Sequence, residues 1–151
     1  MKKIQRIVVA TDFGDLSDTV VDQAIDLATQ LGASVVLVHS YEIPIYGFPD
    51  GVLVAPPDIA SRMGAAAQAG LDGIAQRHGD RGVALKTVLR MGAAWDEVNA
   101  VAAEENADLV VVGTHGRRGL ARALLGSTAE RILRTATLPV FVVHAAAAPR
   151  G

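Results

Sequence analysis

The sequence predicts an α/β protein built on a single doubly wound sheet of five parallel strands, with helices on both faces. Runs rich in β-branched residues alternate with helical patterns along the whole chain, and most of these runs are continuously apolar, as strands covered on both faces are. Half of the 151 residues are hydrophobic and a fifth are charged, which is typical of one compact domain. We expect this domain to span residues 1–145 and residues 146–151 to form a frayed tail.

The first part of the chain predicts a β-α-β unit. Residues 4–10 form a β-rich run that stops at the polar group Thr11-Asp12-Phe13-Gly14-Asp15. An apolar helical stripe follows, with Ser17 or Asp18 as its expected N-cap and Gly32 as its expected C-terminal stop. Residues 34–39 then read as the second strand.

Residues 41–57 interrupt this alternation. The segment holds four prolines and two glycines, and we expect a long surface loop. The loop could be a lid or a contact surface, or an insertion without a role of its own.

The alternation then resumes to the end of the chain. Glycines 64, 70 and 73 weaken the next helix, and Pro139 suits the start of an edge strand because proline cannot donate a ladder hydrogen bond. We expect a helix over 58–78, a strand nearer the sheet edge over 83–89, a helix over 93–105, a strand over 109–112, a helix over 127–135 and a strand over 140–144.

The strand ends predict the order of the sheet. In doubly wound sheets a ligand binds beyond the carboxyl ends of the strands, where the strand order reverses. The first strand ends at Thr11-Asp12 and the fourth at Gly113, which are the most polar and the most glycine-rich ends. We therefore expect these two strands to be neighbours, in the order 3-2-1-4-5, with Asp12 across the crevice from the glycine-rich loop.

Residues 108–128 hold the strongest candidate for a binding site. A buried strand ends at Gly113, Gly116 and Gly119 follow with two arginines between them, and Gly126-Ser127-Thr128 opens a helix. Such a segment can offer backbone N–H groups, hydroxyls and the positive end of a helix dipole to one anion. The pattern favours a phosphate site, although serine and threonine also cap helices without any ligand.

Several other classes do not fit. The chain has no Walker-type phosphate loop and no Gly-x-Gly-x-x-Gly after the first strand, which weakens a dinucleotide-binding interpretation. A net charge of −2 gives no reason to expect a nucleic acid or a membrane as partner. There is no cysteine, so no disulfide or thiolate metal site is expected. The apolar stretch after Met1-Lys2-Lys3 is too short for a signal peptide and no apolar run is long enough to span a bilayer, so we expect a cytoplasmic protein.

The glycine spacing also carries a family resemblance. Gly113-x-x-Gly116, nine residues and then Gly126-Ser127 resemble the nucleotide-binding signature of the universal stress protein family, in its ATP-binding subgroup. The resemblance covers essentially the whole chain. The further matching segments are Ala10-Thr11-Asp12-Phe13 after the first strand, His39 at the end of the second, and Leu138-Pro139-Val140 at the start of the last.

This resemblance implies a Rossmann-like fold of the adenine nucleotide alpha hydrolase type and a set of nucleotide-binding residues. Asp12 would hold the adenosine, beside Ala10, Thr11 and Ser40, and Val112 and Gly113 would pass under the ribose. Ala10 and Ser40 are the two positions that depart from the family's ATP-binding pattern. The residues expected at the phosphates are Gly116, Arg117, Gly126, Ser127 and Thr128.

The function that the resemblance implies is a homodimeric ATP-binding module of the stress response, paired through the last strand at about Pro139 to His144. We predict little or no catalytic turnover, no catalytic residue and no protein metal site, with Mg²⁺ carried on the phosphates. The first alternative is a slow ATPase or phosphotransferase in the same pocket, for which only His115, Asp12 and Asp15 are candidates. The others are a flavin or other nucleotide carrier and a nucleotide-free structural dimer.

Overall fold

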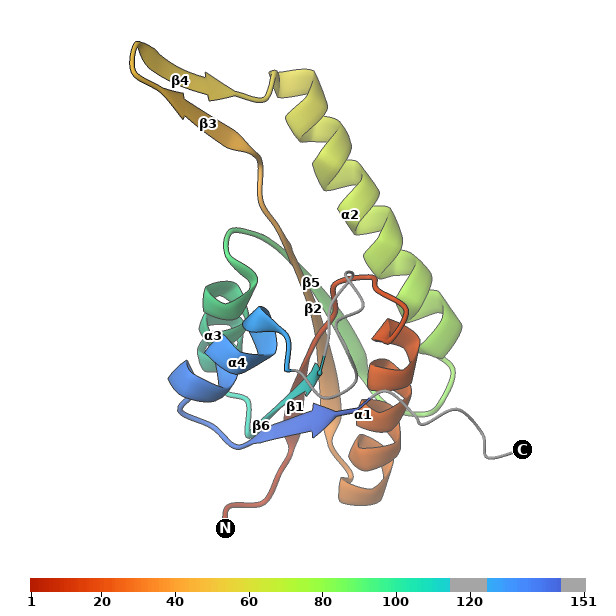
Figure 1. Ribbon diagram of the computed structural model, residues 1–151. Coiled ribbons are helices and arrows are strands. Elements are labelled where there is room, and N and C mark those ends of the chain that lie inside the picture. Colours follow the sequence, from red (N-terminus) through yellow and green to blue (C-terminus); the bar gives the residue numbers. More distant parts are fainter. Residues whose placement is uncertain (115–124, 145–151) are drawn as a thin grey trace, which may run out of the picture.

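A five-stranded parallel sheet forms the centre of the protein (Figure 1). The structure, a computed structural model, describes residues 1–114 and 125–144. The strand order is β5-β2-β1-β6-β7, and each neighbouring pair is parallel. This confirms the predicted order of the sheet. Its strands are β1 (Arg6–Ala10), β2 (Ser34–Tyr41), β5 (Leu85–Met91), β6 (Leu109–Gly113) and β7 (Val140–Val143).

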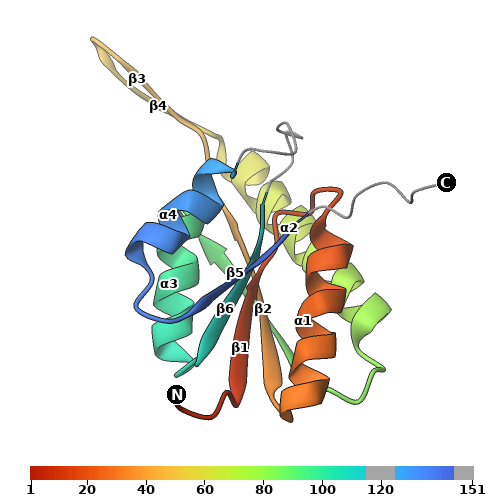
Figure 2. The same ribbon diagram turned by 60° about the horizontal axis from the view of Figure 1, so that its bottom comes forward.

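Helices cover both faces of this sheet, as the sequence predicts. Helices α1 and α2 lie on one side, and α3 and α4 lie on the other (Figure 2). The first two helical connections thus cross one face and the last two cross the other, which makes the sheet doubly wound. The helices are α1 (Ser17–Leu31), α2 (Pro57–His78), α3 (Ala94–Glu104) and α4 (Ser127–Thr135). None of the helices in the described part of the chain is long and apolar enough to cross a membrane.

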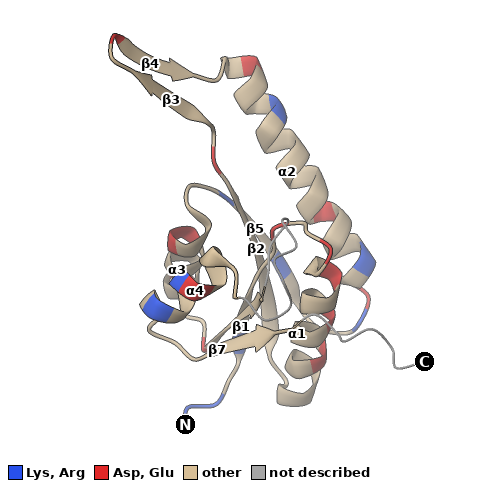
Figure 3. Cartoon of the chain, viewed as in Figure 1, with Lys and Arg blue, Asp and Glu red and all other residues tan. Residues whose placement is uncertain are grey.

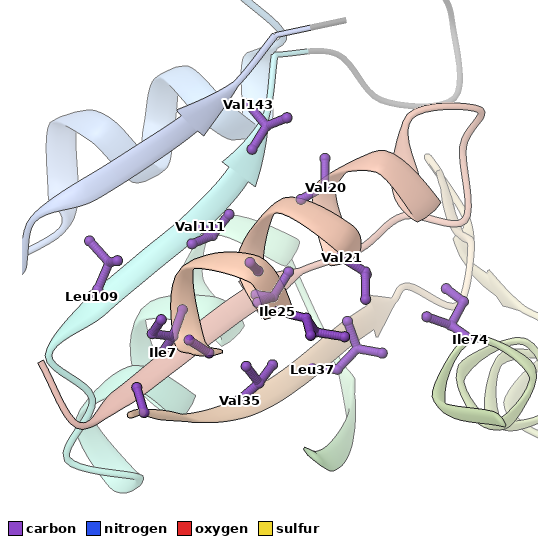
Figure 4. Packing of buried hydrophobic residues seen from close by; sticks show 14 of the residues in the cluster. Ile7, Val20, Val21, Ile25, Val35, Leu37, Ile74, Leu109, Val111 and Val143 are labelled. Atoms are coloured by element: carbon purple, nitrogen blue, oxygen red, sulfur yellow. The ribbon is translucent and has the colours of Figure 1, made fainter. Parts of the chain in front are cut away.

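Alternation along the central strands divides the core in two. Ile7 and Val9 of β1 face α1, whereas Val8 points to the opposite side and packs with residues of α3 and α4. Figure 4 shows the α1 side, where Val21 and Ile25 pack over the strands. Because successive side chains of a strand point to opposite faces, a continuously apolar strand can supply both halves of the core.

The start of α1 differs from the prediction. The cap position is Leu16, and no side chain makes a capping hydrogen bond there. Ser17 is instead the first helical residue and is buried, and its hydroxyl accepts from Thr11 and donates to Asp12 in the preceding loop. Asp18 lies within the first turn and contacts α2. The other end is as predicted, since Gly32 closes the helix at a φ of 65°.

The long surface loop predicted over residues 41–57 is exposed, but it is more regular than the prediction. The segment contains an antiparallel hairpin of two strands, β3 (Ile45–Phe48) and β4 (Gly51–Val54). A turn through Pro49 and Asp50 joins them, and Gly51 follows it with a φ of 153°. Pro-Asp-Gly between two β-rich runs is a known turn pattern, so the sequence did contain the signal.

The sheet edges agree with the sequence. Strands β5 and β7 are the two outer strands of the order. Pro139 immediately precedes β7, where its missing N–H does not interrupt a central ladder. The polar residues at the ends of β1 and β6 thus lie in the middle of the sheet.

Candidate functional site

A cavity of about 480 Å³ lies at the carboxyl ends of β1 and β6. These two strands are neighbours, while the chain leads from β1 to β2 on one side and from β6 to β7 on the other. The cavity therefore lies where the strand order reverses, the usual ligand position in such sheets. Its size is in the range of small-molecule sites.

Nine of the eleven residues predicted to bind nucleotide line this cavity. Gly116 and Arg117 lie outside the described residues, as do His115 and Arg118. The structure therefore brings together segments from β1, β2, β6 and α4 around one space. The nine are Ala10, Thr11, Asp12, Ser40, Val112, Gly113, Gly126, Ser127 and Thr128.

The carboxylate of Asp12 organises the loop on one wall. Its Oδ1 accepts hydrogen bonds from the backbone N–H of Gly14 at 2.8 Å and from the Ser17 hydroxyl at 3.3 Å. Its Oδ2 makes no hydrogen bond to any described residue. Asp12 thus shapes the loop through one of its two carboxylate oxygens.

Two of the predicted hydroxyls are already engaged. The buried Thr11 hydroxyl donates to Ser17 Oγ at 3.0 Å and accepts from the Phe13 N–H at 3.3 Å. The Ser40 hydroxyl donates to the Gly92 carbonyl at 2.7 Å. Both residues line the cavity, but each donates its hydroxyl proton to another group of the protein.

Aromatic packing stabilises the loop that contains Asp12. The Phe13 ring stacks on the His39 ring at 3.9 Å, and the Nδ1 of His39 donates to the Thr11 carbonyl at 2.8 Å. Phe13 has a φ of 61°, a region that L-residues rarely adopt. On its other side the ring lies against Gly70 of α2 so closely that a Cβ there would come within 2.9 Å of it.

The opposite wall is the N-terminus of α4. Gly126 is the cap and supplies no side-chain hydrogen bond, although its own N–H donates to the Thr114 carbonyl. The next N–H groups have no partner within the helix and carry the positive end of its dipole. The exposed side chains of Ser127 and Thr128 lie beside them. This wall is suited to an anion.

Sequence reasoning missed Thr114. It directly follows Gly113 at the end of β6, and its side chain is only 3% exposed. Its Oγ1 is buried and makes no hydrogen bond with the described residues. A buried hydroxyl normally has a hydrogen-bond partner. Thr114 therefore adds to the cavity lining a polar group whose hydrogen-bonding capacity no described residue uses. Its place immediately after a buried strand was the only available signal.

The base of the cavity is apolar. Val38, Val98, Val112 and Ile132 contribute to its lining from four elements on the α3 and α4 side. Gly113 lies where a Cβ would meet Leu16 and Val20 at 3.0 Å, so its small size also lets α1 pack against the end of β6. An apolar base with a polar rim suits a ring system joined to an anionic group.

The described lining offers little for catalysis. Asp12 is its only charged residue, and the lining contains no histidine, lysine or second carboxylate to form an acid–base pair with it. Across the described residues no group of three metal-binding side chains was found.

Comparison with known proteins places the chain in a family. The model of the universal stress protein family matches residues 3–144. The universal stress protein MJ0531 of Methanocaldococcus jannaschii is 33% identical over 141 residues, which cover 92% of this chain and 81% of that protein.

Solved structures agree on the fold. The protein MJ0577 of Methanocaldococcus jannaschii gives a TM-score of 0.80, covering 97% of this chain and 100% of that one. At 20% identity this shows the fold alone. A universal stress protein in complex with cAMP gives a TM-score of 0.69 at 28% identity, covering 95% of this chain and 98% of that one. With the family model spanning nearly the whole sequence, these likenesses establish that the chain belongs to the universal stress protein family.

Proposed function

We propose that the cavity binds an adenine nucleotide, ATP in first place, with Mg²⁺ carried on its phosphates. The observation that carries this proposal is the N-terminus of α4, which opens into the cavity with its unpaired N–H groups and with Ser127 and Thr128. The cavity also has an apolar base and, opposite this helix end, the Asp12 carboxylate. The anionic end of a nucleotide would meet the helix N-terminus, and its ring would meet the apolar base.

The lining also suggests how the ligand lies. The phosphates belong at Gly126, Ser127 and Thr128, and we expect Gly116 and Arg117 to complete that end. The adenosine belongs toward Asp12, whose Oδ2 is available to a ribose hydroxyl or to the base. The cAMP complex of a related universal stress protein supports a nucleotide in this fold.

We further propose that the protein acts as a homodimeric stress-response module with little turnover. Phe141 on the outer strand β7 is 42% exposed, which favours pairing of the last strands. Asp12 already accepts two hydrogen bonds through Oδ1 and has no basic partner in the described lining, which favours binding over hydrolysis. The alternative, a slow ATPase or phosphotransferase, predicts phosphate release that depends on Asp12.

Replacing Ser127 with aspartate tests the phosphate position. A carboxylate at a helix N-terminus stabilises the helix by about 0.3–1 kcal/mol, yet it repels phosphate. We expect Ser127→Asp to retain or raise the unfolding midpoint and to weaken ATP binding at least about tenfold, which corresponds to about 1.4 kcal/mol. Calorimetric titration with ATP and magnesium measures the affinity, and cAMP titrated in parallel tests selectivity.

Ser61→Asp is the matched control. Ser61 is an exposed serine early in α2 and lies away from the cavity, so this variant should bind ATP as the wild type does. Equal affinity in the wild type and Ser127→Asp would place the phosphates elsewhere. A folded wild type that binds neither nucleotide would leave a structural dimer as the better interpretation.

A further inference from the structure

The hairpin β3–β4 stands away from the rest of the protein, beyond the end of β2 (Figures 1 and 2). We call residues 45–54 the arm. The pairing of Tyr46 with Leu53 and of Ile45 with Val54 gives the arm two faces. Large apolar side chains are exposed on both: Ile45 (65%), Val52 (66%) and Val54 (53%) on one, and Tyr46 (59%), Phe48 (60%) and Leu53 (58%) on the other.

No described part of the chain covers the arm. A two-stranded hairpin alone is marginally stable in water, and each of its strands has an outer edge of unpaired backbone groups. Natural proteins commonly place lysine or another charge on such an edge to prevent pairing with another chain. Neither β3 nor β4 contains a charged residue, so the arm lacks that protection.

We propose that the arm is a contact surface for a second copy of this chain. The charges nearest to it in the sequence are acidic, namely Asp50 in its turn and Glu42 and Asp58 on either side, with Arg62 one turn farther along α2. Figure 3 shows red at the tip and the base of the arm and blue farther along α2. Acidic flanks disfavour an anionic membrane or a nucleic acid. Two arms related by a two-fold axis can pair edge to edge in antiparallel fashion, which places their Asp50 tips at opposite ends of a four-stranded sheet.

The exposed apolar area sets the upper limit of such a contact. Side chains of this size that expose a little over half of their surface leave roughly 100 Å² each, or roughly 600 Å² for the six. Edge pairing alone leaves the two faces open, so this area is buried only where the arms also pack against the partner's surface. Its complete burial in both copies would remove on the order of 1,200 Å², the lower limit for a specific stable interface. Pairing of the backbone edges adds hydrogen bonds to this apolar contact.

This contact is distinct from the pairing of the last strands. The arm follows β2, whereas β7 is the outer strand beyond β6, on the other side of β1. A chain that uses both surfaces assembles further than a dimer, as two pairs joined through their arms. The inference therefore goes beyond nucleotide binding and does not depend on it.

Sedimentation of the full chain over a range of concentrations tests the proposal. The double variant Val52→Lys/Leu53→Lys puts one charge on each face of the arm, where the side chains are exposed and the fold does not need them. We expect this variant to halve the mass of the assembly or to weaken association at least about tenfold. The matched control is Met91→Lys, since Met91 is 59% exposed on β5, outside the arm, and it should leave the mass unchanged.

Phe141→Lys separates the two surfaces. Loss of association in the arm variant supports the proposal, whether or not Phe141→Lys also dissociates the protein. An assembly that survives the arm variant overturns it, and so does a wild type that stays monomeric at all concentrations. Because the chain has no cysteine, Leu53→Cys adds an independent readout: a bis-maleimide should cross-link two copies through it, and should not do so through Met91→Cys.

Discussion

At the scale of single residues, the site depends on Phe13. Its left-handed backbone conformation carries a cost of order 1–3 kcal/mol, which the packing of its ring between His39 and Gly70 must offset. Gly70 in turn is costly in the middle of a helix. The two unfavourable features explain each other, because the missing side chain of Gly70 makes room for the ring. The ring then fixes the loop that holds Asp12.

We therefore expect Gly70→Ala to disturb the Asp12 loop. The new Cβ would lie 2.9 Å from Phe13 Cε2 and Cζ, so the ring has to move. The variant should lose the stabilisation of about 0.5–1 kcal/mol that alanine normally brings to a helix, and its affinity for ATP should fall several-fold. Urea unfolding and calorimetry measure the two effects.

Gly73→Ala is the control on the same helix. A Cβ there meets only the end of the flexible Arg77 side chain, at 3.4 Å, so it should stabilise the protein and leave binding unchanged. If both variants stabilise equally and bind ATP equally well, Phe13 does not position the loop.

At the scale of elements, a row of charges joins α1 to the end of α2. His78 lies between Asp18 and Asp22, with its ring nitrogens 2.9 and 3.0 Å from their Oδ1 atoms. Arg77 contacts Asp18, and Arg81 contacts Asp22 and Asp26. The acids recur every fourth residue, so they share one face of α1, and Figure 3 shows red along this helix beside blue at the end of α2. These contacts fix where α2 ends on the body.

This row predicts a dependence of stability on pH. The hydrogen bond from His78 is the largest of the effects that lower the pKa of Asp18 below 3.8, and Arg77 adds to it. A lowered pKa in the folded state contributes stability above the unfolded value and loses it as the pH falls through the folded value. Asp18→Asn should therefore destabilise the protein at about pH 6, by no more than about 1 kcal/mol since the side chain is half exposed, and the difference should shrink toward about pH 3.

Urea unfolding of both proteins across this range checks the sign. Asp80→Asn is the control, since Asp80 makes no hydrogen bond or ion pair with a described residue, and it should stay close to the wild type. A deficit in Asp18→Asn that is as large at the acid end as at neutral pH would show that the carboxylate charge is not what stabilises the contact.

At the scale of the whole molecule, the cavity exists only in the folded chain. Its lining comes from β1, α1, β2, α3, β6 and α4, which the sheet order brings together from distant parts of the sequence. A nucleotide that binds there therefore binds the folded state alone and must stabilise it.

ATP with magnesium should accordingly raise the unfolding temperature. At a free concentration 100 times the dissociation constant the gain is about 2.7 kcal/mol, which corresponds to roughly 5–10 °C for a chain of this length. A thermal scan with and without the nucleotide measures it, and Ser127→Asp should lose most of the shift. A shift of the same size in that variant would mean that ATP stabilises the protein from another site.

The sequence by itself determined the architecture and most of the candidate site. Apolar periodicity is a local property, so it located the four helices and the five strands of the central sheet. The polar ends of two strands then fixed their adjacency, because parallel sheets bind ligands where the order reverses. The glycine spacing indicated the family that the comparisons show.

Only the tertiary structure decided which side chains meet. Asp18 and His78 are 60 residues apart, and no local pattern pairs them. The fit of Phe13 to Gly70 and the burial of Thr114 likewise depend on how helices and strands pack. The arm is an intermediate case. The Pro49-Asp50-Gly51 pattern indicates its turn, but the exposure of both its faces follows from where β2 ends and α2 begins. Contacts of this kind are set by the three-dimensional approach of distant segments, which periodicity along the chain does not encode.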